Sequence, residues 1–429
     1  MVLVTKQLTP FLTLKTVQTD KFKTERLSVT LNDSPDRRMT PIARFVFSVL
    51  KRGCKKYPSQ RELNVRLDNL YSASVAPAFF VGAGEYKLGF CAEMLGEEYS
   101  EKGVFEGTLE LLFDILWNPL KDENGNFLPN YIERERENIC DNIKSVVNNP
   151  RLYANKRFME IMYEGDDYSI PTNGTVEMVN SITSQELTEK YNDLVSNSSY
   201  EIFYVGSKSS EEVEAIIKSF FDNNKFGKEK KADKSVDFAC DTVKVKRVTE
   251  EMQLSQGKLV MGFKSGINIT CGKDFYTMLV VNEIFGASPV SKLFMNVREK
   301  LGLCYYCSSR YDLHKGAIYV SSGIEKSDLK KTEAEILKQL KNIQKGKISA
   351  NEFDAAKKSL VNLYTETTDS ASAIERYYFL RGEFKVKDTI EEAIEKISET
   401  SLEDVIRVAG KLKLDTVYFL CGKEEIDCD

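Results

Sequence analysis

The chain has 429 residues, of which 42% are hydrophobic and 29% are charged, and its formal net charge is −5. That length indicates two or three domains with large apolar cores, and the mixed charge excludes the basic field that draws proteins to nucleic acid or anionic membranes. The single histidine excludes any zinc site built on two histidines of this chain, which is the plan of most metallohydrolases.

The N-terminal sequence and the pattern of cysteines indicate a cytoplasmic location. The N-terminal residues MVLVTKQLTPF lack a charged region that leads into an apolar one, so no secretory signal is expected. No apolar run approaches the ~20 residues of a spanning helix. The nine cysteines are odd in number and scattered, as expected of reduced thiols. We therefore expect a cytoplasmic protein without membrane or nucleic-acid partners.

In chain order, the first half predicts strand pairs that alternate with helical blocks. The predicted elements are a strand at 22–31, helices at 41–52 and 58–71, strands within 79–92, and helices at 103–116 and 128–148. Residues 180–206 then predict a helix behind a Ser or Thr cap and a short strand that ends at Gly206. The charged stretch 223–236 is predicted to be a linker, because few of its residues can pack.

The second half repeats this order. Its predicted elements are a strand at 257–267, helices at 273–286 and 288–301, strands within 303–323, helices at 327–345 and 350–368, and a capped helix and strand within 395–422. Ile182 and Leu187 fall 215 residues before Ile397 and Leu402. The pattern predicts an α+β protein with two homologous lobes, at 1–225 and 237–429, each a mainly antiparallel sheet packed with helices.

Two motifs carry a family resemblance. LKRGCKKYPS (50–59) and SKLFMNVREKLGLCYYCSS (291–309) resemble F-K-G-T-K-K-x-P-S and S-R-L-F-x-x-L-R-E-x-x-G-L-x-Y-x-x-x-S of the insulinase, pitrilysin and mitochondrial processing peptidase family of zinc peptidases. The resemblance covers nearly the whole chain. It implies the two-lobed metallopeptidase fold of the LuxS and processing-peptidase type.

The resemblance also shows which residues are missing. In the family, an H-x-x-E-H helix precedes the first motif, its histidines bind zinc and its glutamate activates water. Counting back from Gly53 places Arg44 and Ser48 at the histidine positions and Phe47 at the glutamate. In ERERENICDN (133–142), Glu135 is present, but the position of the third ligand falls on Asn142.

A guanidinium cannot ligate zinc and a phenyl ring cannot accept a proton. The resemblance therefore implies an inactive, bacterial-type subunit that binds no metal of its own. We predict that the chain does not hydrolyse peptides when it is alone.

The second motif contains an Arg and a Tyr that, in the family, reach the substrate at the zinc site. They match Arg298 and Tyr305. A guanidinium and a phenol can hold a substrate carbonyl and the oxyanion that it becomes. Gly302 is predicted to end the helix between them. The alternative is that the motif only builds the lobe, with Arg298 in a local ion pair such as one to Glu299.

Three weaker signals favour structural roles. His314 lies in a predicted hairpin without an acidic or thiol constellation, so we expect a surface or turn histidine. Cys304 and Cys307 form a lone C-x-x-C, and residues three apart on a strand face opposite ways, so two separately packed thiols are expected. Glu135 is expected on the solvated face of an amphipathic helix.

The leading function is the non-catalytic subunit of a heterodimeric zinc metallopeptidase. This chain would help to enclose and bind a peptide or an unfolded polypeptide, and a homologous subunit with H-x-x-E-H would supply the zinc. A second possibility is a structural or peptide-binding homodimer without a peptidase role. A third, an enzyme of another chemistry in the same chamber, lacks a candidate constellation. Co-purification of an H-x-x-E-H chain would separate the first two.

Overall fold

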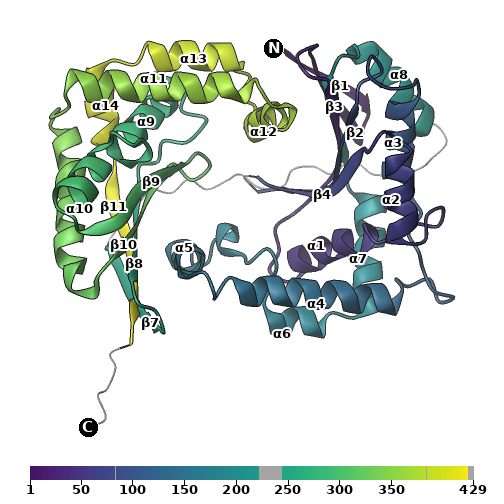
Figure 1. The fold of residues 1–429 in the computed structure, drawn as a ribbon, viewed down its shortest axis with the longest axis horizontal. Helices are drawn as coiled ribbons and strands as arrows, with labels where there is room; N and C mark the ends of the chain where they lie inside the picture. Colours follow the sequence, from purple (N-terminus) through teal and green to yellow (C-terminus); the bar gives the residue numbers. More distant parts are fainter. Residues whose placement is uncertain (83, 222–243, 383, 424–429) are drawn as a thin grey trace, which may run out of the picture. The chain divides into compact units, whose positions relative to one another are not determined.

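The computed structural model describes residues 1–82, 84–221, 244–382 and 384–423. They divide into two compact α+β units (Figure 1). The first contains residues 1–144, 170–221 and 367–382, and the second contains residues 145–169, 244–366 and 384–423. The predicted linker at 223–236, and the predicted lobe boundaries at 225 and 237, lie outside the described residues.

The first unit is built on a six-stranded sheet in the order β1-β2-β6-β3-β5-β4. Neighbouring strands are antiparallel, except that β2 and β6 are parallel. The strands are Leu3–Thr9 (β1), Leu12–Gln18 (β2), Thr24–Asp33 (β3), Ser74–Val81 (β4), Tyr86–Leu95 (β5) and Tyr200–Gly206 (β6). β4 is therefore an edge strand.

The second unit is built on a five-stranded sheet in the order β7-β11-β8-β10-β9. Its strands are Lys246–Met252 (β7), Gly257–Lys264 (β8), Cys304–Asp312 (β9), Ala317–Ile324 (β10) and Lys413–Gly422 (β11). Without β1, the first sheet has the same order, and the parallel pair β2/β6 matches the parallel pair β7/β11. The shared topology confirms the prediction of two homologous lobes with mainly antiparallel sheets.

The helices divide between the two units. Those of the first unit are Met39–Leu50 (α1), Gln60–Asp68 (α2), Val104–Trp117 (α3), Pro129–Ser145 (α4), Val176–Ser181 (α6), Ser184–Asn197 (α7), Ser210–Phe221 (α8) and Ala371–Gly382 (α12). Those of the second are Pro150–Met162 (α5), Lys273–Asn282 (α9), Leu329–Gln344 (α10), Ala350–Thr367 (α11), Ile390–Ser398 (α13) and Leu402–Ala409 (α14), with π-helical turns at Glu283–Ala287 (η2) and Leu293–Lys300 (η3).

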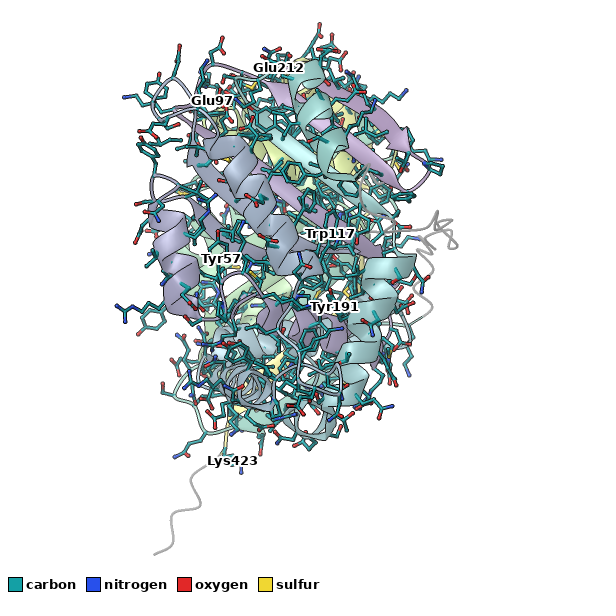
Figure 2. The ribbon with its side chains drawn as sticks, turned by 90° about the vertical axis from the view of Figure 1, so that its right-hand side faces the viewer. Tyr57, Glu97, Trp117, Tyr191, Glu212 and Lys423 are labelled. Carbon is teal, nitrogen blue, oxygen red and sulfur yellow. The ribbon has the colours of Figure 1, made fainter. Side chains whose placement is uncertain are left out.

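The predicted Ser and Thr caps are confirmed. Thr183 begins α7 and Ser401 begins α14, and each forms a capping box with the acidic residue three positions later. Between α3 and α8, aromatic rings fill the core of the first unit (Figure 2). The Trp117 indole stacks on Phe113 with ring centres 4.2 Å apart and donates to Tyr200 Oη at 3.2 Å.

Each sheet is covered on one face by a helix from the other half of the sequence. α5 belongs to the second unit, where it lies across the sheet from α10 (Figure 1). Ala154, Phe158 and Met162, spaced one turn apart, form its buried stripe. Gly262 of β8 makes room for this stripe, because a Cβ there would lie 2.6 Å from both Phe158 and Met162.

α12 belongs to the first unit, where it packs on β3 and β6. Its Glu375 carboxylate lies 2.5 Å from Arg26 Nε of β3, and its Phe379 ring lies 4.6 Å from that of Phe80. Across the described ranges, none of the helices combines the length and the apolar character that a membrane-spanning segment requires.

Candidate functional site

The helix at the degenerate zinc-motif positions is α1. The Asp36 side chain starts it by accepting hydrogen bonds from the backbone N–H groups of Arg38 and Met39, at 2.8 and 2.7 Å. Nine of its residues are buried, whereas Arg44 and Ser48, one turn apart, are partly exposed. The two histidine positions therefore share one accessible stripe of the helix.

Contacts within the first unit hold Arg44 in place. Its Nη1 donates to Thr172 Oγ1 at 2.8 Å, and its guanidinium lies 4.3 Å from the centre of the Phe79 ring on β4. Burial lowers the pKa of Arg44, but a guanidinium stays charged at neutral pH. Ser48 Oγ donates to the Arg44 carbonyl at 3.3 Å.

Phe47, at the position of the catalytic glutamate, belongs to the hydrophobic core. Its side chain is 3% exposed, and its ring lies 5.6 Å from that of Phe90 on β5. A carboxylate at this position would be surrounded by apolar side chains, where a charge is costly to bury.

α4 carries the position of the third ligand. Asn142 is exposed there, whereas Glu135 is 2% exposed and its carboxylate is paired with the Arg52 guanidinium. The prediction that Glu135 lies on a solvated face is wrong. It shares the inner face of α4 with Ile132 and Cys140, and Arg52, at the end of α1, neutralises it.

These residues do not fit a zinc ion. Arg44 brings a fixed positive charge, Phe47 has no donor atom, and the neutral oxygens of Ser48 and Asn142 are poor substitutes for imidazole and carboxylate. Within the described ranges, no group of three or more His, Cys, Asp or Glu side chains could hold a metal ion.

The second motif lies on η3 and β9. Gly302 ends the helix as predicted, with a φ of +62° that favours glycine, and Tyr305 follows on β9. The Arg298 side chain is 42% exposed, with its Nε 3.6 Å from Glu299 Oε1. This is the local pair that the sequence left as an alternative. An exposed contact of that length adds little stability. The guanidinium also lies 4.7 Å from the centre of the Phe294 ring on the same helix.

Tyr305 is the extra residue of a β-bulge. Tyr306 pairs with Gly323 of β10, and Cys304 pairs with the next residue, Ile324, so Tyr305 has no opposite residue. Its side chain is 75% exposed. Beside it lies a pocket of about 350 Å³, between residues 302–305 on one side and residues 323–325 and 328 on the other.

Apolar side chains are also exposed around this motif. Val290, Met295 and Leu301 each have about half of their surface in solvent, at 48, 47 and 47%. Together with Arg298 and Tyr305 they define what we call the motif surface.

The bulge also corrects the prediction for the C-x-x-C pair. Cys304 is opposite Ile324 and Cys307 is opposite Ser322, two positions apart on β10, so both thiols point to the same face of the sheet. The Cys307 thiol hydrogen bonds to the Cys304 sulfur and lowers the pKa of Cys304. Sequence spacing alone placed them on opposite faces, because it carries no sign of the extra residue.

His314 occupies the turn between β9 and β10, as predicted, but it is 7% exposed and therefore not at the surface. Its backbone N–H donates to Asp312 Oδ1 at 3.0 Å. Burial lowers the pKa of its imidazole. No feature of this turn connects it to the motif surface.

Comparisons with known proteins agree with the motifs. Residues 181–360 match the family model described as "Peptidase M16 inactive domain". A Bacillus subtilis (strain 168) protein named "Probable inactive metalloprotease YmfF" is 29% identical over 426 residues, with 96% of each chain covered. A second protein of that strain, "Uncharacterized zinc protease YmxG", is 24% identical over 311 residues, 71% of this chain and 72% of its own.

Solved structures give the same result for the fold. The crystal structure of a conserved protein from Enterococcus faecalis V583 superposes with a TM-score of 0.91 at 27% identity, over the whole of both chains. A peptidase M16 inactive domain from Pseudomonas fluorescens superposes with a TM-score of 0.79 at 15% identity, over 99% of each chain. The resemblance inferred from the two motifs is confirmed.

Proposed function

We propose that this chain, which is similar to inactive peptidase-like proteins of the M16 family, is the non-catalytic subunit of a heterodimeric zinc metallopeptidase. It binds a peptide or an unfolded polypeptide, and a homologous partner with an intact H-x-x-E-H helix supplies the metal. Bacillus subtilis (strain 168) has both a relative named as inactive and a relative named as a zinc protease. This co-occurrence supports a pairing of the two kinds of subunit, for which we propose a cytoplasmic location.

One contrast carries the proposal. At the degenerate zinc-motif positions, Arg44 and Phe47 are built into the first unit. On the motif surface, Arg298 and Tyr305 are exposed, and Arg298 makes local contacts, a long one to Glu299 and one to the Phe294 ring, whose centre lies 4.7 Å from its guanidinium. Exposed side chains with local contacts remain accessible to a ligand.

The partner's zinc would polarise the scissile carbonyl and activate water. This chain would contribute charge and hydrogen-bond donors from the motif surface. The Arg298 guanidinium presents a fork of N–H donors to the carbonyl oxygen and to the oxyanion that develops from it. The Tyr305 hydroxyl, at the bulge in β9, donates a further hydrogen bond.

The first unit offers a second contact for an extended peptide. β4 is the edge strand of the first sheet, and an edge strand can accept a peptide as an added strand. Its side chains alternate, so Phe79 contacts Arg44 of α1 and Phe80 contacts Phe379 of α12. Both helices would flank an added strand, and the Arg44 cation would favour acidic residues in it.

The test is reconstitution with a zinc-bearing homologue from the same organism. We expect peptidase activity that a chelator abolishes, and an Arg298→Ala subunit should lower turnover by about a hundredfold, the usual effect of removing one oxyanion donor. Lys300→Ala is the matched control, because Lys300 is an exposed cation on the same helix. It should leave turnover unchanged.

Two results would contradict the proposal. One is full turnover with Arg298→Ala, and the other is failure of any zinc-bearing homologue to form a complex with this chain. A zinc-free, inactive dimer of this chain that still binds peptides would support the alternative, a structural or peptide-binding homodimer.

A further inference from the structure

The β-bulge at Tyr305 brings two thiols together in the wall of the pocket. Cys304 and Cys307 share one face of β9, and the Cys307 thiol hydrogen bonds to the Cys304 sulfur. Ser322 of β10 is opposite Cys307, and its hydroxyl donates to the Tyr306 carbonyl at 2.9 Å. The register of β9 with β10 therefore brings the two thiols together on one face of the sheet.

The two thiols differ in access. Cys304 is half-buried and lines the pocket of about 350 Å³ beside Tyr305, whereas Cys307 is 3% exposed. A small oxidant in the pocket reaches Cys304 first. The hydrogen bond from Cys307 and the nearby Arg298 cation both lower the pKa of Cys304, which increases the fraction of reactive thiolate.

We propose that Cys304 and Cys307 are a reversible oxidation site for hydroperoxides, in which Cys304 reacts with the peroxide and Cys307 resolves the product as a disulfide. The inference does not rest on the proposed peptidase role, although the site adjoins Tyr305.

The reaction balances as follows. The Cys304 thiolate attacks the distal peroxide oxygen, the O–O bond breaks, and the alkoxide or hydroxide leaves and takes up a proton. The Cys307 sulfur then attacks the Cys304 sulfenic acid, the S–S bond forms, and water leaves. The two thiols lose two electrons in total, and the peroxide gains them.

Backbone spacing permits the disulfide. The residues opposite Cys304 and Cys307 are two strand positions apart, which places the two Cα atoms about 6.7 Å apart. That separation lies at the upper end of the disulfide range. A disulfide also needs Cβ atoms about 3.5–4.5 Å apart, so the backbone between the two cysteines, which carries Tyr305, must shorten when the bond forms.

The chain offers a direct readout. Trypsin cleavage after Lys300 and Arg310 releases LGLCYYCSSR, which contains Cys304 and Cys307 and no other cysteine. After the folded full-length protein is treated with hydrogen peroxide and its remaining thiols are alkylated, we expect this peptide without alkyl groups and about 2 Da lighter, for two hydrogens lost. Dithiothreitol should restore both thiols.

Three variants sharpen the test. Cys304→Ser should leave Cys307 unreacted, and Cys307→Ala should shift the pH profile of Cys304 alkylation upward, because alanine removes the donor that lowers the Cys304 pKa. Cys271→Ser removes an exposed thiol elsewhere in the same unit and should leave disulfide formation unchanged.

Three results would overturn the proposal. They are a peptide that carries two alkyl groups after peroxide treatment, preferential oxidation of Cys271 over Cys304, or the same pH profile for Cys304 in the wild type and in Cys307→Ala. A merely packed pair of thiols would give the first and the third.

Discussion

The two units repeat one topology, but their candidate residues differ in how the fold holds them. In the first, the candidate residues on α1 contact the fold, since Arg44 packs on Phe79 and Phe47 on Phe90. In the second, Arg298 and Tyr305 are exposed. The difference indicates that a position of a catalytic motif can take a structural role, as Phe47 does in the first core. Changes in the first unit should therefore alter stability, and changes on the motif surface should alter function.

The sheet faces that α12 and α5 cover also differ between the two units. The difference lies in the polar groups that meet there. Under α12, Lys15 and Lys87 each lie 2.8 Å from the Glu201 carboxylate. Beside α5, the polar contacts are made by phenols, with Tyr163 Oη 2.6 Å from Tyr319 Oη. Burial raises the pKa of both phenols, so they stay neutral at all ordinary pH values. The first unit depends on buried charges, and this contact in the second does not.

The largest effect is expected from Phe47→Ala. It removes a buried ring from the first core and should lower the free energy of unfolding by about 3–5 kcal/mol. Trp117 is the only tryptophan and lies in the first unit, so its fluorescence in urea reports this unit directly. Tyr305→Ala, in the second unit, is the comparison and should cost less than about 0.5 kcal/mol. Its unfolding is followed by far-ultraviolet circular dichroism, because Trp117 does not report the second unit. Equal decreases in the free energy of unfolding for the two variants would contradict the contrast between the two units.

Acid should destabilise the first unit through Glu201. Burial alone would raise the pKa of this carboxyl, but Lys87 and Lys15 outweigh it and hold the pKa at about 2, against an ordinary 4.5. A group with a lowered folded pKa contributes stability above its unfolded pKa and loses it as the pH falls through the folded value. The first unit should lose about 3 kcal/mol between pH 5 and pH 2 from this group.

Glu201→Gln tests that expectation. The variant should be less stable at pH 7 and show a flatter pH dependence of Trp117 fluorescence between pH 5 and pH 2. Glu189→Gln changes an exposed carboxylate of the same unit and should behave as the wild type. Acid unfolding that is unaltered by Glu201→Gln would show that the buried lysines do not depend on this carboxylate.

Tyr305→Phe should affect function and leave stability unchanged. Loss of the phenol hydroxyl removes one donor from the motif surface and should lower turnover of the reconstituted complex on the order of tenfold to a hundredfold. Tyr99→Phe is the matched control, because Tyr99 is an exposed tyrosine of the first unit, at 48%. A change in urea midpoint without a change in turnover would assign Tyr305 to the fold.

The smallest effect concerns the degenerate zinc motif. A variant with Arg44→His, Ser48→His and Asn142→Glu restores the ligand types and should bind about one zinc per chain, measured by metal analysis after dialysis. It should remain inactive, because Phe47 cannot act as a base. Ser48→His alone supplies one ligand and should bind no zinc. A folded triple variant without zinc would show that these positions do not correspond to the family's ligands.

Local patterns predicted most of the regular elements. The amphipathic helix expected at 350–368 is α11, Ala350–Thr367, and the strand expected at 257–267 is β8, Gly257–Lys264. β1, Leu3–Thr9, was missed because its side chains are exposed or half-buried and it pairs only with β2. An edge strand without a buried face shows little apolar alternation.

Only part of the candidate site was predicted from the sequence. The motifs located Arg298, Tyr305 and the turn at Gly302, because glycine and motif spacing act locally. They did not show that Glu135 is buried against Arg52, a contact between residues 83 positions apart in the chain. Nor did they show the bulge, which exists only in the pairing of β9 with β10.

The sequence by itself therefore determined the repeated α+β plan, the missing zinc ligands and the family resemblance, since these depend on composition, periodicity and short motifs. Only the tertiary structure decided which helix covers which sheet, which charges are buried together, and that Cys304 and Cys307 meet. Those features arise from pairings across long stretches of chain, where one extra residue in a strand reverses the side on which the following side chains lie.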